Sequence, residues 1–218
     1  AGLTAAQLGS AAAGQALARA GVSPGQVDEA VFGCARQAGG GPNVARQVAY
    51  RAGVPQEIPA FTVNMACGSG LKSIELAYRA VRDGDAEVVL AGGTESMSRV
   101  PYLLTGARWG YRMGHQQAVD AMYQDGFLCP LAEQLMGETA EKLAEVYGIS
   151  REEQDAFAAG SQERAAAALR EGRFEAETFT VAASGRKGEE PVRVDEHPRP
   201  DTTPASLARL PPVFKAEG

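Results

Sequence analysis

The chain has 218 residues, of which 44% are hydrophobic, and carries a formal net charge of -6. This length is enough to bury a sizeable core, and the acidic balance argues against a broad surface for nucleic acid. No run has the uninterrupted apolar length of a membrane span and no signal-peptide pattern is present, so we expect a soluble protein with no membrane partner.

The first part of the chain alternates helical and strand patterns. Thr4 and Gln7 form a capping box, and Gly21 is placed to end the helix that follows. Such alternation predicts an α/β layer with a mainly parallel sheet. The expected elements are a helix over 8–20, a strand over 27–34, a helix from Pro42 or Asn43 to a stop at Gly53, a strand over 59–64, a helix over 71–84 and a strand over 87–93.

The segment 96–129 has a different character, with many aromatic and methionine side chains and no sustained period. We expect an ordered excursion rather than disorder, because large apolar side chains such as Trp109 and Met113 need burial, a partner subunit being one candidate. Beyond it the pattern predicts helices over 138–147 and from Ser150 to about 171, a strand pair over 174–183 and 191–196 joined by the charged turn 184–190, and an extended, proline-rich tail over 197–218.

Cys67 lies in the run "NMACGSG", between a predicted strand and a predicted helix. This is the layout of a nucleophile elbow, in which a tight turn presents a reactive side chain at the mouth of a helix. The small neighbours let a substrate carbonyl approach the backbone, and the helix N-terminus favours the thiolate and can receive an oxyanion. The alternative from this local pattern is a buried cysteine that serves only packing.

The other two cysteines, Cys34 and Cys129, are far from Cys67 in the sequence, and no C-x-x-C pair is present. Three scattered cysteines predict neither a disulfide framework nor a zinc site, and they fit a reducing cytoplasm. We expect Cys34 in the core and Cys129 in packing rather than as a second catalytic thiol. Glu95 and Ser96, where a strand meets a turn, are expected to be structural hydrogen-bonders around Cys67.

The stretch "VNMACGSGLKSIELAYRAVRDGDAEVVLAGGTESMSRVPYLL" resembles the acyl-thioester cysteine region of the thiolases, which join or split acyl-CoA units. The likeness extends to "GCARQAGGGPNVARQ", to the loop-domain segment "MGETAEKLAEVYGISREEQDAF" and to "DEHPRPDTTPASLARLPPVFKAEG". It implies the five-layered α/β/α/β/α thiolase fold, of which this chain would hold the first half, without its first strand, over 1–98 and the inserted loop domain over 99–218.

The resemblance also implies roles for individual residues. Cys67 would be acylated by a CoA thioester, and its own backbone N–H would help to hold the oxyanion. The family's CoA-contacting arginine and serine fall on Arg199 and Ser206. The pocket for pantetheine and the acyl chain falls near Phe127, Leu135 and Met136.

Leu135 departs from short-chain biosynthetic thiolases, which commonly have histidine before this Met-Gly pair. An apolar residue there suits longer or more varied acyl chains and favours a 3-ketoacyl-CoA thiolase. Three further motifs of the family are absent: the Gly-His-Pro histidine, the second cysteine and the Asn-Glu-Ala-Phe asparagine. They belong to the second half of the fold, so this span alone is expected to lack the catalytic base and second thiol.

Two histidines could in principle substitute for that base. His115 lies in the irregular aromatic segment and is expected at a surface or interface. His197, in "EHPRP", superficially resembles the Gly-His-Pro histidine, but its place beside Arg199 fits a CoA-phosphate loop better than a catalytic base.

The resemblance therefore implies a cytoplasmic homo-oligomeric acyltransferase of fatty acid metabolism, a dimer or a tetramer, with "PYLLTGARWGYRMGH" as a tetramer-forming loop. Its substrate is a CoA thioester, and no cofactor is bound permanently. Two alternatives stay open: a decarboxylating ketoacyl synthase of the same fold, and a non-catalytic chain that binds CoA or a partner subunit. Acyl-chain length and the synthetic or degradative direction are not decided by the sequence.

Overall fold

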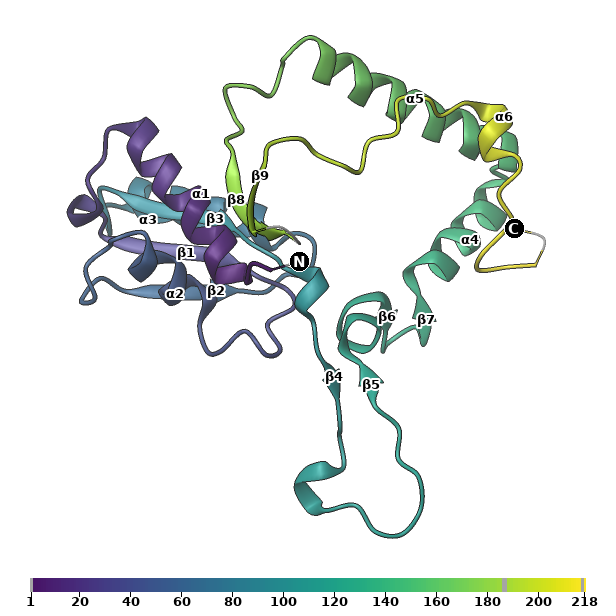
Figure 1. Cartoon of the computed structure of the whole chain (residues 1–218), viewed down its shortest axis with the longest axis horizontal. Coiled ribbons are helices and arrows are strands. Elements are labelled where there is room, and N and C mark those ends of the chain that lie inside the picture. The colour runs from purple at the N-terminus through teal and green to yellow at the C-terminus, as the bar shows by residue number, and fades with distance from the viewer. Residues whose placement is uncertain (1, 186–187, 217) are drawn as a thin grey trace. The chain divides into compact units, whose positions relative to one another are not determined.

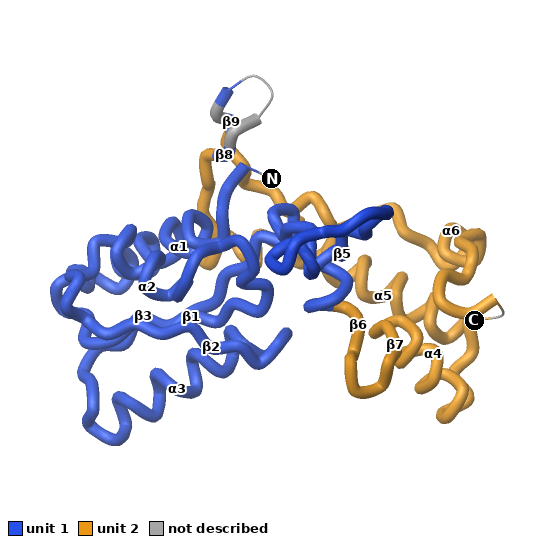
Figure 2. Tube along the Cα trace, turned by 90° about the horizontal axis from the view of Figure 1, so that it is seen from below, with its two compact units in different colours: residues 1–126, 183–190 blue, residues 127–182, 191–218 orange. Residues whose placement is uncertain are grey.

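The structure is a computed structural model that describes residues 2–185, 188–216 and 218. The chain forms two compact units, one of residues 1–126 with 183–190 and one of residues 127–182 with 191–218 (Figure 2). Among the described residues, no helix combines the length and apolar composition that a membrane crossing requires. The boundary between residues 98 and 99 drawn from the family resemblance stays a prediction.

The first unit is built on a three-stranded parallel sheet of order β2-β1-β3. Helices α1 and α2 cover one face of this sheet and helix α3 covers the other (Figures 1 and 2). The mixed α/β class predicted from the sequence is confirmed. The bounds are α1 Ala5–Ala20, β1 Glu29–Gly33, α2 Val44–Arg51, β2 Ala60–Val63, α3 Ser69–Asp83 and β3 Val89–Gly93.

Local capping chemistry sets the helix boundaries. The Thr4 and Gln7 side chains form the predicted capping box, and Gly21 ends α1 in the left-handed conformation with φ 66°. Helix α2 begins after Asn43, whose side chain accepts a hydrogen bond from the Arg46 N–H. Between these helices and the sheet lies the core, whose fully buried members include Val27, Ala30, Val44 and Val48.

Helix α3 presents two different faces. Its buried residues are Ser69 and Ser73, and the Ser73 hydroxyl lies 2.7 Å from the Gly70 oxygen and 2.6 Å from the Gly92 oxygen. A buried hydroxyl needs hydrogen-bond partners, and here one of them is the Gly92 oxygen of β3. Ser73 therefore holds α3 against β3. The opposite, apolar face of α3 is exposed in this chain, with large side chains at Leu71, Ile74, Tyr78 and Val81.

The aromatic excursion forms a long hairpin-like ribbon, whose antiparallel pairing joins Tyr102 to Asp120 and Leu103 to Val119 (Figure 1). The expectation of order stays a prediction. Two of its large apolar side chains are not buried in the described structure: Trp109 is 88% exposed and Met113 is fully exposed. The elements are β4 Tyr102–Leu103, β5 Val119–Asp120 and the 3-10 turns Met97–Arg99 and Ala107–Trp109, with a further 3-10 turn at Pro24–Gln26.

The second unit contains two long helices and short strands. Helix α5 begins with the predicted capping box of Ser150 and Glu153. Three predictions were wrong in part: the tail contains a short helix, α6, the first strand of the predicted pair begins only at Val181, and the second spans Gly188–Val192 instead of 191–196. Residues 186–187 of the predicted charged turn lie outside the described residues. The bounds in this unit are β6 Leu128–Cys129, β7 Gln134–Leu135, α4 Met136–Tyr147, α5 Arg151–Arg170 and α6 Pro204–Leu207. A π-helical turn, Tyr123–Phe127, and the paired strands β8 Val181–Gly185 and β9 Gly188–Val192 belong mainly to the first unit.

Candidate active site

Cys67 lies in a tight turn between β2 and α3, as the elbow pattern predicts. Ala66 has φ 48°, a left-handed conformation that a non-glycine residue adopts only when its surroundings hold it there. The Asn64 carboxamide oxygen accepts a hydrogen bond from the Ala66 N–H at 3.0 Å. The Ser69 hydroxyl lies 2.8 Å from the Met65 nitrogen and 2.6 Å from the Ala66 oxygen, which closes the turn.

The result is an exposed thiol at the mouth of a helix. Cys67 precedes Gly68, the N-cap residue of α3, and lies where the parallel strands end. The carboxyl ends of parallel strands are the usual place of ligand sites in α/β sheets. An accessible sulfur here can attack an electrophilic carbon that approaches from solvent.

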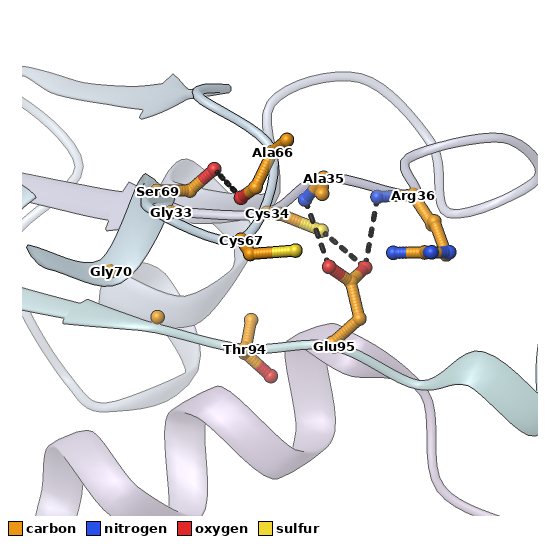
Figure 3. Close-up of a pocket in the computed structure, with 11 residues that line it drawn as sticks. Gly33, Cys34, Ala35, Arg36, Ala66, Cys67, Ser69, Gly70, Thr94 and Glu95 are labelled. Carbon is orange, nitrogen blue, oxygen red and sulfur yellow. Dashed lines mark hydrogen bonds between the residues drawn. The ribbon is translucent and has the colours of Figure 1, made fainter. Parts of the chain in front are cut away.

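A pocket of about 300 Å³ surrounds the thiol within the first unit (Figure 3). It is formed by the ends of β1 and β3 and the first turn of α3. The residues that line it are Gly33, Cys34, Ala35, Arg36, Ala66, Cys67, Ser69, Gly70, Gly93, Thr94 and Glu95.

Two glycines permit this arrangement. A Cβ atom on Gly33 would lie 2.4 Å from the carbonyl carbon of Ser69, and one on Gly93 would lie 3.2 Å from the Cα of Gly70. The first turn of α3 therefore packs directly on the backbone of β1 and β3. Sequence reasoning did not single out these glycines, although each stands at the end of an apolar strand run, where close backbone approach is a usual reason for glycine.

Glu95 lines the pocket and holds residues 34–36 in place by hydrogen bonds. Its carboxylate accepts hydrogen bonds from the backbone N–H groups of Ala35 and Arg36 at 2.9 and 3.0 Å, and from the Cys34 thiol at 3.4 Å (Figure 3). The predicted structural role of Glu95 is confirmed. Burial, together with the negative charge and hydrogen bond of Glu95, raises the pKa of Cys34 from 9.0 to about 12.

The neighbours of Glu95 connect the site to the start of α1. The Thr94 hydroxyl donates to the Ala5 oxygen at 2.6 Å, and the Ser96 hydroxyl donates to the Leu3 oxygen at 2.8 Å. Ser96 is thus a structural hydrogen-bonder as expected, but it does not line the pocket. Cys34 is 1% exposed and belongs to the core, as predicted.

The predicted pantetheine and acyl-chain residues lie together in the second unit. Strands β6 and β7 pair antiparallel, with Leu128 opposite Leu135. Phe127 directly precedes β6 and Met136 directly follows β7, so both lie at the same end of this strand pair. Met136 also begins α4. Cys129 is half-buried in β6 and carries no disulfide.

The predicted CoA-contacting residues lie in the same unit, near α5 and α6. The Arg199 N–H donates to the Gln162 side chain at 2.7 Å, and the Arg199 side chain is exposed. Ser206 lies in α6, where its hydroxyl donates to the Thr203 oxygen at 2.8 Å.

The two histidines belong to different units, His115 to the first and His197 to the second. His115 is exposed on the ribbon, as predicted, and neither His115 nor His197 is among the described residues that line the pocket. The His197 N–H donates to the Asp195 carboxylate at 3.3 Å, which makes this histidine part of a turn in the second unit.

Comparison with known proteins gives a consistent result. The sequence profile of the family described as "Thiolase, N-terminal domain" matches residues 1–218. The chain is 50% identical over 220 residues to an acetyl-CoA acetyltransferase of Pseudomonas aeruginosa, covering 100% of this chain and 56% of that protein. It is 47% identical over 215 residues to an acetyl-CoA acetyltransferase of Syntrophomonas wolfei, covering 98% of this chain and 54% of that protein.

Solved structures agree with the sequence comparison. The crystal structure of the Bacillus anthracis acetyl-CoA acetyltransferase superposes with a TM-score of 0.93 at 38% identity, covering 98% of this chain and 54% of that one. The chain spans about half the length of the curated relatives it matches.

Proposed function

The chain belongs to the thiolase family, and on that premise we propose that Cys67 carries the acyl group in a CoA-dependent acyl transfer. The reaction is the thiolytic cleavage of a 3-ketoacyl-CoA or, in reverse, the Claisen condensation of acetyl-CoA. The observation that carries the proposal is the exposed Cys67 thiol on a turn held open by the left-handed Ala66. CoA and its thioesters are substrates, and no resident cofactor is required.

The proposed cleavage has two balanced steps. The Cys67 sulfur attacks the ketone carbon of the 3-ketoacyl group, and the bond between that carbon and the α-carbon breaks. The α-carbon takes a proton and leaves as acetyl-CoA, while the shortened acyl group stays on Cys67. The thiol of a second CoA then attacks this acyl-cysteine, which releases a shortened acyl-CoA and the Cys67 thiol.

Stabilisation of the negative oxygen in both steps requires hydrogen-bond donors held in place before the reaction. We propose the Cys67 backbone N–H as one of them, because the Asn64 and Ser69 contacts fix the turn that carries it. The proton acceptor and the second thiol are proposed to come from residues of a whole thiolase outside this span. The 218-residue chain is then expected to accept an acyl group without sustained turnover.

Substrate recognition is proposed for five residues of the second unit. Arg199 suits a CoA phosphate, since its side chain is exposed and carries a permanent charge. Ser206 can accept a further hydrogen bond, because its hydroxyl oxygen has two lone pairs and one of them accepts the Thr203 N–H. Phe127, Leu135 and Met136 offer apolar surface to pantetheine and the acyl chain, and the apolar Leu135 favours a 3-ketoacyl-CoA substrate over acetoacetyl-CoA alone.

We also propose a cytoplasmic homo-oligomer, a dimer or tetramer, that acts in fatty acid metabolism. The exposed Trp109 and Met113 of the segment 96–129 support association, since large apolar side chains left in water are stabilised by burial against a partner. The three free cysteines fit a reducing compartment.

The test is acylation followed by intact mass and peptide mapping. The chain is incubated with acetyl-CoA at alkaline pH, so that thiolate forms without a general base. One acetyl group on Cys67 is expected, with none in Cys67→Ser and an unchanged adduct in Cys129→Ser. Alkylation by iodoacetamide shows whether the Cys67 thiol is accessible. If Cys67 is alkylated but gains no acetyl group from acetyl-CoA, the proposal is refuted.

The same experiment separates the alternatives. Acylation of Cys67 by an acyl-carrier-protein thioester but not by a CoA thioester would point to a ketoacyl synthase. CoA binding that is unaltered in Cys67→Ala, without any adduct, would point to a non-catalytic chain. Thiolysis that persists over many turnovers by a chain of verified length would refute the proposed need for residues outside this span.

A further inference from the structure

Two cysteines, not one, line the pocket of the candidate active site. Cys34 follows β1, and its N–H donates to the Val63 oxygen of β2 at 3.1 Å. The Asn64 side chain donates to the Ala35 oxygen at 3.2 Å, and Cys67 follows Asn64 by three residues within the tight turn. The backbone thus brings both cysteines to one end of the sheet, where their side chains extend toward the same space beside Glu95 (Figure 3).

The two thiols differ sharply in access and hydrogen bonding. Cys67 is exposed, whereas Cys34 is 1% exposed and donates its thiol hydrogen to Glu95. The raised pKa of Cys34 keeps it protonated under ordinary conditions. A reagent from solvent therefore meets Cys67 first, and the proposed acyl transfer gives Cys34 no task.

We propose that Cys34 is a resolving thiol that forms a reversible disulfide with Cys67 after a peroxide has oxidised Cys67. This inference is independent of the proposed acyl transfer, since it requires only the two thiols and an oxidant. A disulfide between them would block the exposed nucleophile and would protect it from irreversible oxidation.

The chemistry balances in two steps. The Cys67 thiol releases its proton to solvent, the thiolate attacks a peroxide oxygen, and the O–O bond breaks. Cys67 becomes a sulfenic acid, and the leaving alkoxide or hydroxide takes up a proton from solvent to give an alcohol or water. The Cys34 sulfur then attacks the Cys67 sulfur, the S–O bond breaks, and one water leaves as the disulfide forms. The peroxide is thereby reduced by two electrons, which the two thiols supply together.

Glu95 is placed to assist the second step. Its carboxylate already accepts the Cys34 thiol hydrogen and can take that proton as the sulfur attacks. The N–H groups of Ala35 and Arg36 hold the carboxylate in position from the other side. A dithiol reductant reverses the reaction by thiol-disulfide exchange.

The experiment treats the reduced chain with one equivalent of hydrogen peroxide and maps peptides without reduction. The expected product is a Cys34–Cys67 cross-link within one chain that disappears on addition of dithiothreitol. Cys129→Ser should give the same cross-link, because Cys129 is outside the pocket. In Cys34→Ser treated with two equivalents of hydrogen peroxide, one for each oxidation step, Cys67 should instead proceed to the sulfinic acid, which dithiothreitol does not reduce.

The wild-type map alone can overturn the proposal, so a poorly folded variant leaves it testable. Cys67 sulfinic acid without a cross-link, or cross-links only through Cys129 or between chains, would refute it. Failure of acetylation together with formation of the cross-link would count against the acyl transfer alone. Acetylation without a cross-link would count against the resolving role alone.

Discussion

The Ser69 hydroxyl lies 2.6 Å from the carbonyl oxygen of Ala66, the residue that precedes Cys67 and has φ 48°. The same hydroxyl accepts the Met65 N–H, so one side chain spans the turn that presents the thiol. Ser69 is buried and belongs to the first turn of α3. The conformation of the elbow therefore depends on a residue that follows the nucleophile.

Replacing Ser69 by alanine should destabilise the fold and slow acylation of Cys67. The change leaves the Met65 N–H and the Ala66 carbonyl without this partner, at a cost of about 1–3 kcal/mol. Chemical denaturation and the rate of acetyl-CoA labelling measure the two effects. Ser10→Ala is the matched control, because Ser10 donates only to the Gln7 oxygen on the exposed side of α1; equal losses in both variants would contradict the assigned role.

Gly33→Ala should be strongly destabilising, by at least about 2 kcal/mol, because the added methyl group meets helix backbone rather than a movable side chain. Gly14→Ala is the matched control, since a Cβ there meets nothing within 4 Å and the site lies inside α1. That change should stabilise by roughly 0.5–1 kcal/mol. Thermal melts compare the two variants, and a harmless Gly33→Ala would show that α3 does not sit on β1 as described.

The pKa of Cys34 predicts a loss of stability at alkaline pH. The folded-state pKa of about 12 exceeds the ordinary value of 9.0, so the folded state holds the proton more tightly than the unfolded state. The stabilising contribution is complete below pH 9 and declines as the pH rises toward 12, by up to about 1.4 kcal/mol per pH unit. Urea denaturation between pH 8 and 11 should show a shallower decline in Cys34→Ala; identical slopes would refute the assignment.

The exposed ribbon predicts an effect on assembly. Replacing Trp109 and Met113 by serine removes the two most exposed large apolar side chains of the ribbon. Sedimentation velocity should show a shift toward smaller species, with the melting temperature nearly unchanged. Tyr147→Ser is the control, because Tyr147 is 73% exposed but lies in α4. An unchanged distribution would remove the ribbon from the proposed oligomer interface.

The order of helices and strands in the first unit was predictable because local rules set it. Capping side chains such as Thr4 and Asn43 mark helix starts, and apolar runs mark buried strands. The Cys67 elbow was predictable for the same reason: its residues are adjacent in sequence.

The rest of the pocket could not be predicted from local pattern. Cys34 and Glu95 are 61 residues apart and meet only because β1 and β3 pair in parallel register. Leu71, Ile74, Tyr78 and Val81 recur at helical spacing, but this spacing could not reveal that serines, and not these apolar residues, pack on the sheet. The place of a side chain in the core depends on which elements surround it, and periodicity within one element does not carry that information.

The exposed apolar face of α3 affects the solubility of the chain. Leu71 is 74% exposed and Ile74 is 56% exposed, and both remain in contact with water in this chain. Such surface is poorly hydrated, so sulfate and other kosmotropic salts should lower the solubility of the chain more steeply than its net charge of -6 suggests. The exposed face of α3 should therefore lower the solubility of the chain most during salting-out and during storage at high concentration.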